Sequence, residues 1–269
     1  MHIIQIYTHS PLRNFSYLIG NADNEYWCID PFDGAAIAAE LKARGGRLLG
    51  IINTHEHDDH TCGNEALLRL MQCSGEAIVV AGHAACADDI PGFNRILVAA
   101  QWLPIDEHYG LKVLDTPGHS HGHVCLLLQN KCLHRVHTEA VFSGDILFNA
   151  GVGHCRKAGA SVKALYTTLT EQFYPLDDAV RVYPGHEYMR NNLAFSLSLE
   201  ADNPIAKKWL AVAEAHDWRE GNLTTTLFDE RQLNPFFRLQ NTDIIRSLNR
   251  EGVSDLEVFM ALRARRDQW

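Results

Sequence analysis

Residues 51–60, IINTHEHDDH, join an apolar run to a dense group of histidines and aspartates. The pattern H-x-H-x-D-H consists of imidazoles and short carboxylates, the side chains that bind zinc-like cations. Alternate side chains of an extended segment share one face, so His55 and His57 can point at one ion. Asp59 and His60, around the following turn, can then reach a second ion. The alternative is a solvated acidic loop rich in histidine, which the density of ligand types disfavours.

Three other places repeat this design of an apolar, strand-like run, a tight turn with glycine and a potential ligand. They are LKVLDTPGHS, which carries His119, EAVFSGD, which ends at Asp145, and AVRVYPGH, which ends at His186. In α/β folds, functional side chains gather at strand ends, because rigid strands aim them and the loops leave room for a ligand. Each of these histidines alone would more often be an ordinary core or surface residue. Together the four strand ends predict a single metal site.

The size and charge of the chain narrow the class of protein. With 269 residues it is long enough for one large domain or two modest ones, and we expect two. Hydrophobic residues make up 46% and charged residues 21%, as in packed globular proteins. The net charge of -9 argues against a nucleic-acid partner.

Targeting and redox signals point to the cytoplasm. The first residues lack a basic region followed by a long apolar core, and no run of about 18 apolar residues occurs anywhere. The 7 cysteines are scattered and never spaced C-x-x-C. This pattern predicts reduced thiols rather than a disulfide framework. We therefore expect a cytoplasmic protein with no membrane partner.

The pattern of apolar residues changes along the chain. Up to about residue 186, short β-rich runs alternate with helical stretches, which predicts a layered α/β arrangement. From residue 187 onward, helical signals replace the strands. One predicted helix has Asn203 as its cap, and another begins with the capping box from Ser254 to Glu257. Between these two helices, the segment GNLTTTLFDERQLNPFFRL has no clear period and is interpreted as an ordered connecting loop.

The motifs resemble those of the metallo-β-lactamase superfamily and, within it, the glyoxalase II branch of hydroxyacylglutathione hydrolases. The resemblance covers nearly the whole chain and rests on NFSYLI, THEHDDH, TPGHSHGH, GDILFNAGVG, YPGHEYMRNN, NPFFR and ALRARRDQW. It implies an α/β (α+β) fold: an αββα sandwich of two mixed sheets in residues 1–186. A C-terminal, all-helical substrate-binding domain would follow in residues 187–269.

The resemblance also assigns the metal ligands. His55, His57 and His119 would hold one metal, Asp59, His60 and His186 the other, and Asp145 would bridge both. Two neighbouring cations can lower the pKa of a shared water, so the nucleophile would be a metal-bridging hydroxide oriented by Asp59 and Asp145. The ions are expected to be zinc, with iron or manganese as alternatives, because histidine and carboxylate ligands suit all three.

The implied substrate is a small-molecule thioester, S-2-hydroxyacylglutathione, and more specifically S-D-lactoylglutathione. A monomeric enzyme would cleave it to glutathione and D-lactate in methylglyoxal detoxification. A thiolate leaves without a general acid, which favours thioester hydrolysis at such a site. By the resemblance, Tyr188, Arg263 and Arg266 would bind glutathione. Without it, a solvated helix face would be the usual interpretation of the two arginines.

One segment departs from the family pattern. After AGVG the family commonly has a basic residue and, two positions later, often a tyrosine, whereas this chain has His154 and Arg156 at these positions. The charge would then be supplied by Arg156 or the neighbouring Lys157. His123, in SHGH, matches a family position and is expected to contact a metal ligand rather than the metal itself.

Two other functions are weighed against hydrolysis. A persulfide dioxygenase of the same superfamily would use a single iron, but its pattern usually lacks the second set of ligands that is complete here. A non-catalytic, metal-stabilised binding protein would need only four closed ligands. A nuclease is disfavoured by the net charge, and a secreted lactamase by the missing secretion signal.

Overall fold

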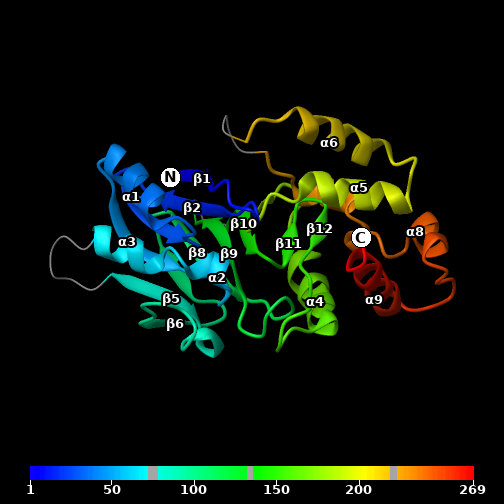
Figure 1. Cartoon of the computed structure of the whole chain (residues 1–269), viewed down its shortest axis with the longest axis horizontal. Helices are drawn as coiled ribbons and strands as arrows, with labels where there is room; N and C mark the ends of the chain where they lie inside the picture. The colour runs from blue at the N-terminus through cyan, green and yellow to red at the C-terminus, as the bar shows by residue number, and fades with distance from the viewer. Residues whose placement is uncertain (72–77, 132–135, 219–222) are drawn as a thin grey trace.

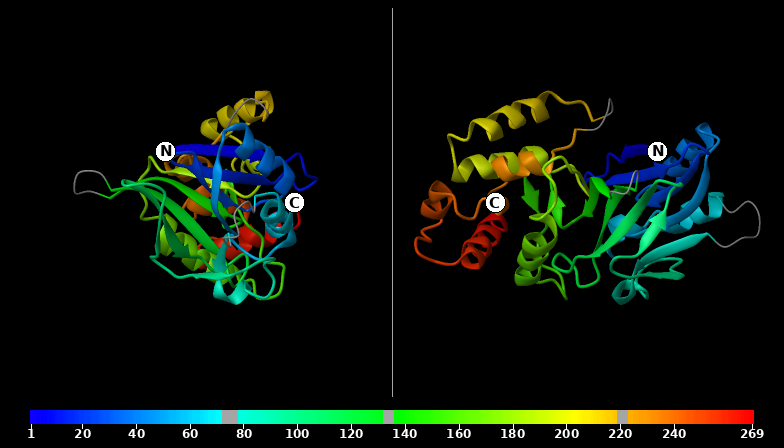
Figure 2. Two further views of the ribbon diagram at one scale, coloured as in Figure 1. Left: turned by 90° about the vertical axis from the view of Figure 1, so that its left-hand side faces the viewer. Right: turned by 180° about the vertical axis from the view of Figure 1, so that it is seen from behind.

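A computed structural model of the chain describes residues 1–71, 78–131, 136–218 and 223–269. Two β-sheets lie against each other, and helices cover their outer faces (Figure 1). The helices that end the chain gather at the opposite end of the molecule from α1 and α3, as the views from the side and from behind also show (Figure 2). The predicted αββα sandwich of two mixed sheets, followed by helices, is thus confirmed.

The first sheet contains six strands in the order β1-β2-β3-β4-β5-β6. The pairs β1–β2 and β2–β3 are antiparallel, and the remaining pairs are parallel. The strands are β1 His2–Tyr7, β2 Phe15–Gly20, β3 Glu25–Ile29, β4 Arg47–Ile52, β5 Val79–His83 and β6 Arg95–Leu97. Because β3 and β4 run in the same direction, the residues that follow them emerge at one edge of the sheet.

The second sheet contains five strands in the order β13-β10-β9-β8-β7. Strand β13 is parallel to β10, and the other neighbours are antiparallel. The strands are β7 Trp102–Pro104, β8 Tyr109–Asp115, β9 Val124–Asn130, β10 His137–Gly144 and β13 Arg181–Pro184, with a separate hairpin of β11 Leu147–Phe148 and β12 Gly151–Val152. The parallel pair brings the ends of β10 and β13 together.

Strand β9 shows that the second sheet is covered on both faces. Successive side chains of a strand point to opposite sides. Leu126 and Leu128 pack between the two sheets, whereas Cys125 and Leu127 pack on the helical side of the second sheet. All four are buried, so the strand is apolar without alternation, as expected for a strand between two layers.

Helices close the outer faces of both sheets. Helix α1 (Gly34–Ala43) and helix α3 (Asn64–Met71) pack together on the first sheet, where Ile37 and Leu67 share a core cluster. Helix α4 (Val162–Thr168) and the π-helical turn that continues it pack on the second sheet. The short helix α2 (Asp58–Thr61) and the 3-10 turn Ala84–Cys86 lie in the loops of the first sheet.

The C-terminal part is helical, and in the described residues no named strand follows β13. Its helices are α5 Met189–Leu199, α6 Pro204–Ala215, α7 Leu227–Leu233, α8 Thr242–Ser247 and α9 Asp255–Arg266, with a 3-10 turn at Pro235–Phe237. The predicted caps are present: Asn203 accepts hydrogen bonds from the first turn of α6, and Ser254 and Glu257 form a capping box on α9. Phe259 of α9 packs in the same cluster as Leu165 of α4.

The prediction of a loop between these helices was wrong where helix α7 lies. Thr226 and Asp229 form a second capping box, and Leu227 and Leu233 are buried. The helix is too short for its period to stand out in the sequence, and burial of its two leucines stabilises it. Residues 221 and 222 of the segment lie outside the described residues.

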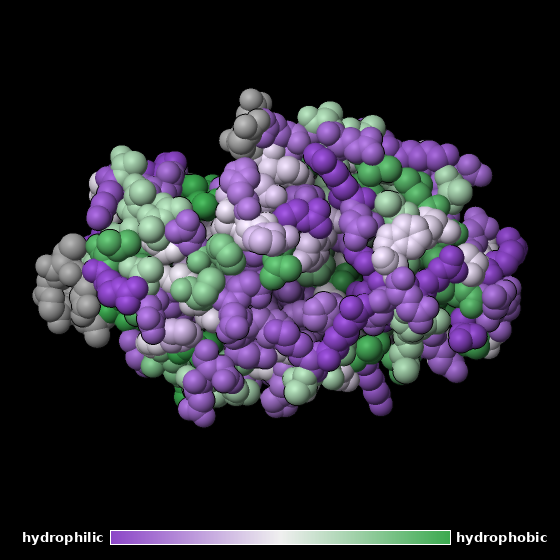
Figure 3. All heavy atoms as spheres, in the orientation of Figure 1, coloured by the Kyte–Doolittle hydropathy of each residue, from purple (hydrophilic) through white to green (hydrophobic). Residues whose placement is uncertain are grey.

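The exterior of the molecule is polar. In Figure 3 hydrophilic residues cover most of the visible face, and apolar ones form small, scattered groups. No helix in the described ranges is long and apolar enough to cross a bilayer. The expected division into residues 1–186 and 187–269 remains a prediction, since helices α4 and α9 share one core cluster.

Candidate metal centre

Four strand ends bring the predicted ligands together. His55 and His57 follow β4, with Asp59 and His60 on the helix after them. His119 follows β8, Asp145 follows β10 and His186 follows β13. The side chains form overlapping groups that could hold a metal ion. The first group is His55, His57 and His119, and the second is Asp59, His60 and His186. A further group of His55, His60 and Asp145 overlaps both.

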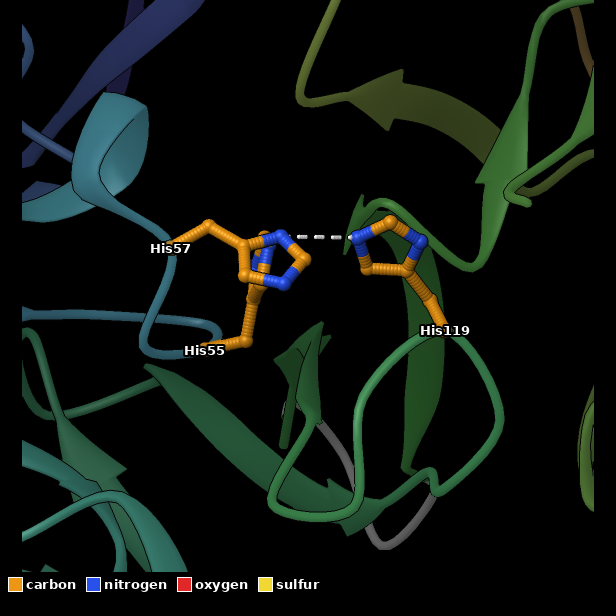
Figure 4. A group of neighbouring side chains, drawn as sticks. All are labelled: His55, His57 and His119. Atoms are coloured by element: carbon orange, nitrogen blue, oxygen red, sulfur yellow. Dashed lines mark hydrogen bonds between the residues drawn. The ribbon is translucent and has the colours of Figure 1, made fainter. Parts of the chain in front are cut away.

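The first group consists of three imidazoles that face one another (Figure 4). His57 Nδ1 lies 2.9 Å from His55 Nε2 and 3.0 Å from His119 Nε2. A single proton on His57 can satisfy only one of these contacts. His57 Nε2 is buried and has no hydrogen-bond partner among the described residues. Three nitrogens converging in this way suit a cation better than a proton network.

The second group combines two imidazoles with a carboxylate. His60 Nε2 and His186 Nε2 are 3.2 Å apart. Asp59 Oδ2 lies 3.5 Å from His60 Nε2 and 3.4 Å from His186 Nε2. The donor set of nitrogen and oxygen suits zinc, iron or manganese.

Asp145 lies between the two groups. Its Oδ1 is 3.4 Å from the Nε2 atoms of both His60 and His186, and its Oδ2 is 3.4 Å from His119 Nε2. Oδ1 is buried without a hydrogen-bond partner in the described part of the chain. A buried carboxylate oxygen is costly unless it is paired or coordinates a metal. The residues present therefore fit the metal that the sequence predicts.

A fixed acceptor holds the far side of three of the imidazole rings, those of His119, His186 and His60. His119 Nδ1 donates to the carbonyl of His154, and His186 Nδ1 donates to that of Leu12, each over 2.8 Å. His60 Nδ1 donates to Asp30 Oδ2 over 2.9 Å. These contacts make Nδ1 the hydrogen-bond donor of each ring, so Nε2 is the atom that points into the cluster.

Asp30 is a supporting residue that the sequence analysis did not identify. Besides His60, its carboxylate accepts hydrogen bonds from the Thr54 amide and hydroxyl, each over 2.7 Å. Thr54 Oγ1 can then accept a hydrogen bond from His55 Nδ1, 3.0 Å away. Asp30 directly follows β3. The predicted ligands also follow the ends of strands, so the same sequence pattern could have identified Asp30.

Asn14 holds the other carboxylate of the cluster. Its Nδ2 donates to Asp59 Oδ2 over 2.9 Å and to the Asp59 carbonyl over 3.1 Å. Asn14 also forms an isolated β-bridge with His186. It lies at position 14, far from the histidine motif in sequence, and no local pattern indicated this role.

His123 positions Asp145 through the backbone. Its Nε2 accepts a hydrogen bond from the Asp145 amide over 3.2 Å, and its Nδ1 lies 3.0 Å from the hydroxyl of Thr116. Gly144, with a φ of +47°, permits this approach, because a Cβ there would lie 2.6 Å from His123 Nε2.

Burial and neighbouring charges shift the pKa values of His119 and His60 in opposite directions. Burial lowers the pKa of His119 to about 4, so its ring is neutral near pH 7 and available as a ligand. Burial also acts to lower the pKa of His60, but the carboxylates of Asp145 and Asp30 outweigh it and raise this pKa to about 9. This end of the cluster therefore carries an excess of negative charge that favours a cation.

Two of the residues predicted to bind substrate lie beside the cluster. The ring of Tyr188 stacks on that of His186 with centroids 4.8 Å apart and planes at 3°. The ring of His154 lies 4.9 Å from that of His119. Because both side chains contact rings of the cluster and are partly exposed, they lie between the metal centre and solvent.

The three arginines predicted to bind substrate have partners within the protein. Arg263 is 4% exposed and donates from Nη1 to the carbonyls of Val152 and Gly153 over 2.9 and 3.1 Å. Arg263 and Arg156 both form ion pairs with Asp267. Arg266 donates to Asn192 Oδ1 over 3.1 Å. Arg156 and Arg263 therefore meet at Asp267, in the last turn of the chain.

Comparisons with known proteins cover the whole chain. The sequence model of the metallo-beta-lactamase superfamily matches residues 9–186, and that of the hydroxyacylglutathione hydrolase C-terminus matches residues 187–269. The chain is 40% identical over 277 residues to a hydroxyacylglutathione hydrolase of Nitrosococcus oceani, covering 100% of both chains. It is also 40% identical over 279 residues to one of Polaromonas sp., again covering 100% of both.

Solved structures show a similar fold at lower sequence identity. ETHE1 from Myxococcus xanthus aligns with a TM-score of 0.65 and 22% identity, covering 99% of this chain and 98% of that one. TTHA1623 in a di-iron-bound form aligns with a TM-score of 0.58 and 24% identity, covering 88% of this chain and 100% of that one. At these identities the likeness concerns the fold.

Proposed function

Because this chain belongs to the hydroxyacylglutathione hydrolase family of the metallo-beta-lactamase superfamily, we propose that it hydrolyses S-2-hydroxyacylglutathione. The preferred substrate is S-D-lactoylglutathione, and the products are glutathione and D-lactate. This reaction is a step in methylglyoxal detoxification. The observation that carries the proposal is the convergence of histidines and aspartates from four strand ends into overlapping ligand groups.

Two divalent ions, zinc with iron or manganese as alternatives, are proposed for the centre. His55, His57 and His119 would hold one, Asp59, His60 and His186 the other, and Asp145 would contact both. When bound, a pair of such ions lowers the pKa of water and polarises a carbonyl oxygen. The second ligand group, which is complete, favours this hydrolytic centre over the mono-iron alternative.

The carboxylates of the chain orient the attacking oxygen. Asn14 fixes one oxygen of Asp59, and His123 fixes the backbone of Asp145, so both carboxylates are held before substrate binds. Asp59 and Asp145 would accept hydrogen bonds from the nucleophile and direct it at the thioester carbon. The departing thiol has a pKa of about 8.5, so the thiolate leaves without a proton donor.

The thiol carrier is proposed to bind beside Tyr188. Arg266 and Arg156 would attract its carboxylates, with His154 at the edge of the site. Arg263 would contribute by holding the loop that carries His154, because its guanidinium donates to two carbonyls of that loop. We further propose that the protein is a cytoplasmic monomer.

The function can be tested with protein freed of metal by chelation and then titrated with zinc. Release of glutathione from S-D-lactoylglutathione should return with added metal and saturate at two equivalents. Asp59→Asn should lower kcat at least about 100-fold. Asp58→Asn, next to it in sequence but outside the ligand groups, is the matched control and should retain activity. Turnover that is indifferent to chelation would contradict the mechanism.

A further inference from the structure

Arg13 differs from the other arginines around the metal centre. Arg263, Arg156 and Arg266 each donate hydrogen bonds to other residues, as does Arg190, which donates to the Ala213 carbonyl. The guanidinium of Arg13 donates no hydrogen bond to any residue that the structure describes. Glu187 Oε2 is 3.5 Å away, longer than the roughly 2.7–2.9 Å of a charge-assisted hydrogen bond. The donors of Arg13 are therefore open to a ligand.

The Arg13 guanidinium lies over the ring of Tyr188. Its central carbon is 5.0 Å from the ring centroid, which is the geometry of a cation–π contact. The ring of Tyr188 in turn stacks on His186. The Arg13 side chain is 38% exposed, so its charge borders solvent at the Asp59 and His186 end of the centre.

The backbone around Arg13 is fixed to the loop that carries His186. The Leu12 carbonyl accepts from His186 Nδ1, the Arg13 carbonyl accepts from the Glu187 amide, and the Phe15 amide donates to the Gly185 carbonyl. These bonds hold Arg13 at a φ of 58°, in the left-handed region. That conformation is unfavourable for a residue with a Cβ atom. An arginine in a position that favours glycine suggests that its side chain has a role.

The negative charge of the chain and of the metal centre opposes the binding of an anionic substrate, so an added cation would favour binding. The chain has a net charge of -9, and the centre itself contains Asp59 and Asp145. Glutathione carries two carboxylates, which such a field repels.

We propose that Arg13 binds a carboxylate of the thiol carrier and thereby helps select anionic thioesters, an inference that rests on the proposed function. The planar guanidinium matches a carboxylate with two parallel hydrogen bonds. Arg266 would bind the other carboxylate. Arg13 is thus a specificity residue contributed by the N-terminal loop.

The test compares two thioesters that share an acyl group. S-D-lactoylglutathione has a charged carrier, and S-D-lactoyl-N-acetylcysteamine has a carrier without carboxylates. For Arg13→Gln and Arg13→Gly, KM for the glutathione thioester should rise about 10- to 100-fold, the range of a charged hydrogen bond, while kcat changes less than about threefold. The kinetics of the neutral thioester should stay those of the unmodified protein.

Two further measurements separate substrate binding from folding. Arg13→Gly relieves the strained backbone and removes the ion pair with the buried Glu187. Its Tm should therefore equal or exceed that of Arg13→Gln, which loses the same ion pair but keeps the strain. Arg69→Gln removes the same charge from an exposed position on α3 and should leave KM for both thioesters unchanged. Metal content should be equal in all variants.

The possible results distinguish this inference from the proposed function. An unmodified, metal-loaded protein that hydrolyses neither thioester would overturn both. Hydrolysis of the glutathione thioester with unchanged KM in the Arg13 variants would overturn the role of Arg13 alone. An equal loss on both thioesters would also overturn it, because Arg13 would then act through the shape of the centre.

Discussion

At the scale of single residues, the metal centre depends on side chains that form hydrogen bonds to the proposed ligands and are not ligands themselves. Asp30 orients His60 directly and His55 through Thr54, and His123 holds the amide of Asp145. Such supporting hydrogen bonds restrict the rotation of a ligand before the metal binds. Loss of these hydrogen bonds should therefore lower the affinity for metal.

His123→Leu is expected to weaken metal binding by about 10- to 100-fold, the typical effect of removing an outer contact. The substitution removes the acceptor of the Asp145 amide and leaves that amide buried without a partner. Competition with a chromophoric chelator measures the change.

His121→Leu is the matched control for this experiment. His121 belongs to the same SHGH motif but is exposed, so its replacement should leave metal affinity unchanged. Equal affinities in the His123 and His121 variants would show that His123 does not position Asp145.

At the scale of elements, helix α7 connects the C-terminal region to the hairpin of β11 and β12. Glu230 on this helix is fully buried and accepts hydrogen bonds from the Ala150 amide, Thr225 Oγ1 and Asn234 Nδ2. Burial outweighs these hydrogen bonds and raises the pKa of Glu230 to about 7. The contact between the two elements should therefore depend on pH.

The unfolding free energy should fall as pH rises through this range. The folded state keeps the Glu230 proton up to about pH 7, whereas the unfolded chain loses it near its ordinary pKa of 4.5. The folded state thus binds more protons between these values, and the loss amounts to about 3 kcal/mol at 1.36 kcal/mol for each pH unit.

Urea unfolding of Glu230→Gln across this pH range measures the effect. The variant should lack the part of the pH dependence that Glu230 contributes. Glu65→Gln, an exposed position on α3, should retain the dependence of the unmodified protein. Parallel curves for the Glu230 variant and the unmodified protein would refute the prediction.

At the scale of the whole molecule, the metal centre joins the two sheets. Its proposed ligands follow strands of both sheets and extend from residue 55 to residue 186. An ion that binds only the folded arrangement stabilises it by mass action. The stability of the chain should therefore depend on bound metal.

Chelation is expected to lower the Tm by about 10 °C, as estimated for an ion present at 1,000 times its Kd and a chain of this size. Differential scanning calorimetry measures the shift, and added zinc should reverse it. Magnesium, a poor match for imidazole ligands, serves as the control ion and should not restore the Tm. A Tm unaffected by chelation would show that the centre does not cross-link the sheets.

Local patterns in the sequence predicted a layered α/β arrangement, and the resemblance of its motifs to a known family implied the sandwich. The strands β2, β4 and β9 are mainly apolar, and the histidine motif places four predicted ligands, three histidines and one aspartate, close together in sequence. Helix α7 was missed, since its stability comes from buried leucines rather than from a visible period. Ligand roles remain predictions, although the structure places the predicted residues side by side.

The tertiary structure alone decided which distant residues support the centre and how each arginine is used. Asn14 reaches Asp59 across 45 positions, and Arg263 reaches Val152 across 111. Neither contact leaves a local pattern, because its partners are set by the packing of sheets and helices. A motif fixes the chemistry of its own side chains, whereas the fold determines which other donors, acceptors and charges surround them.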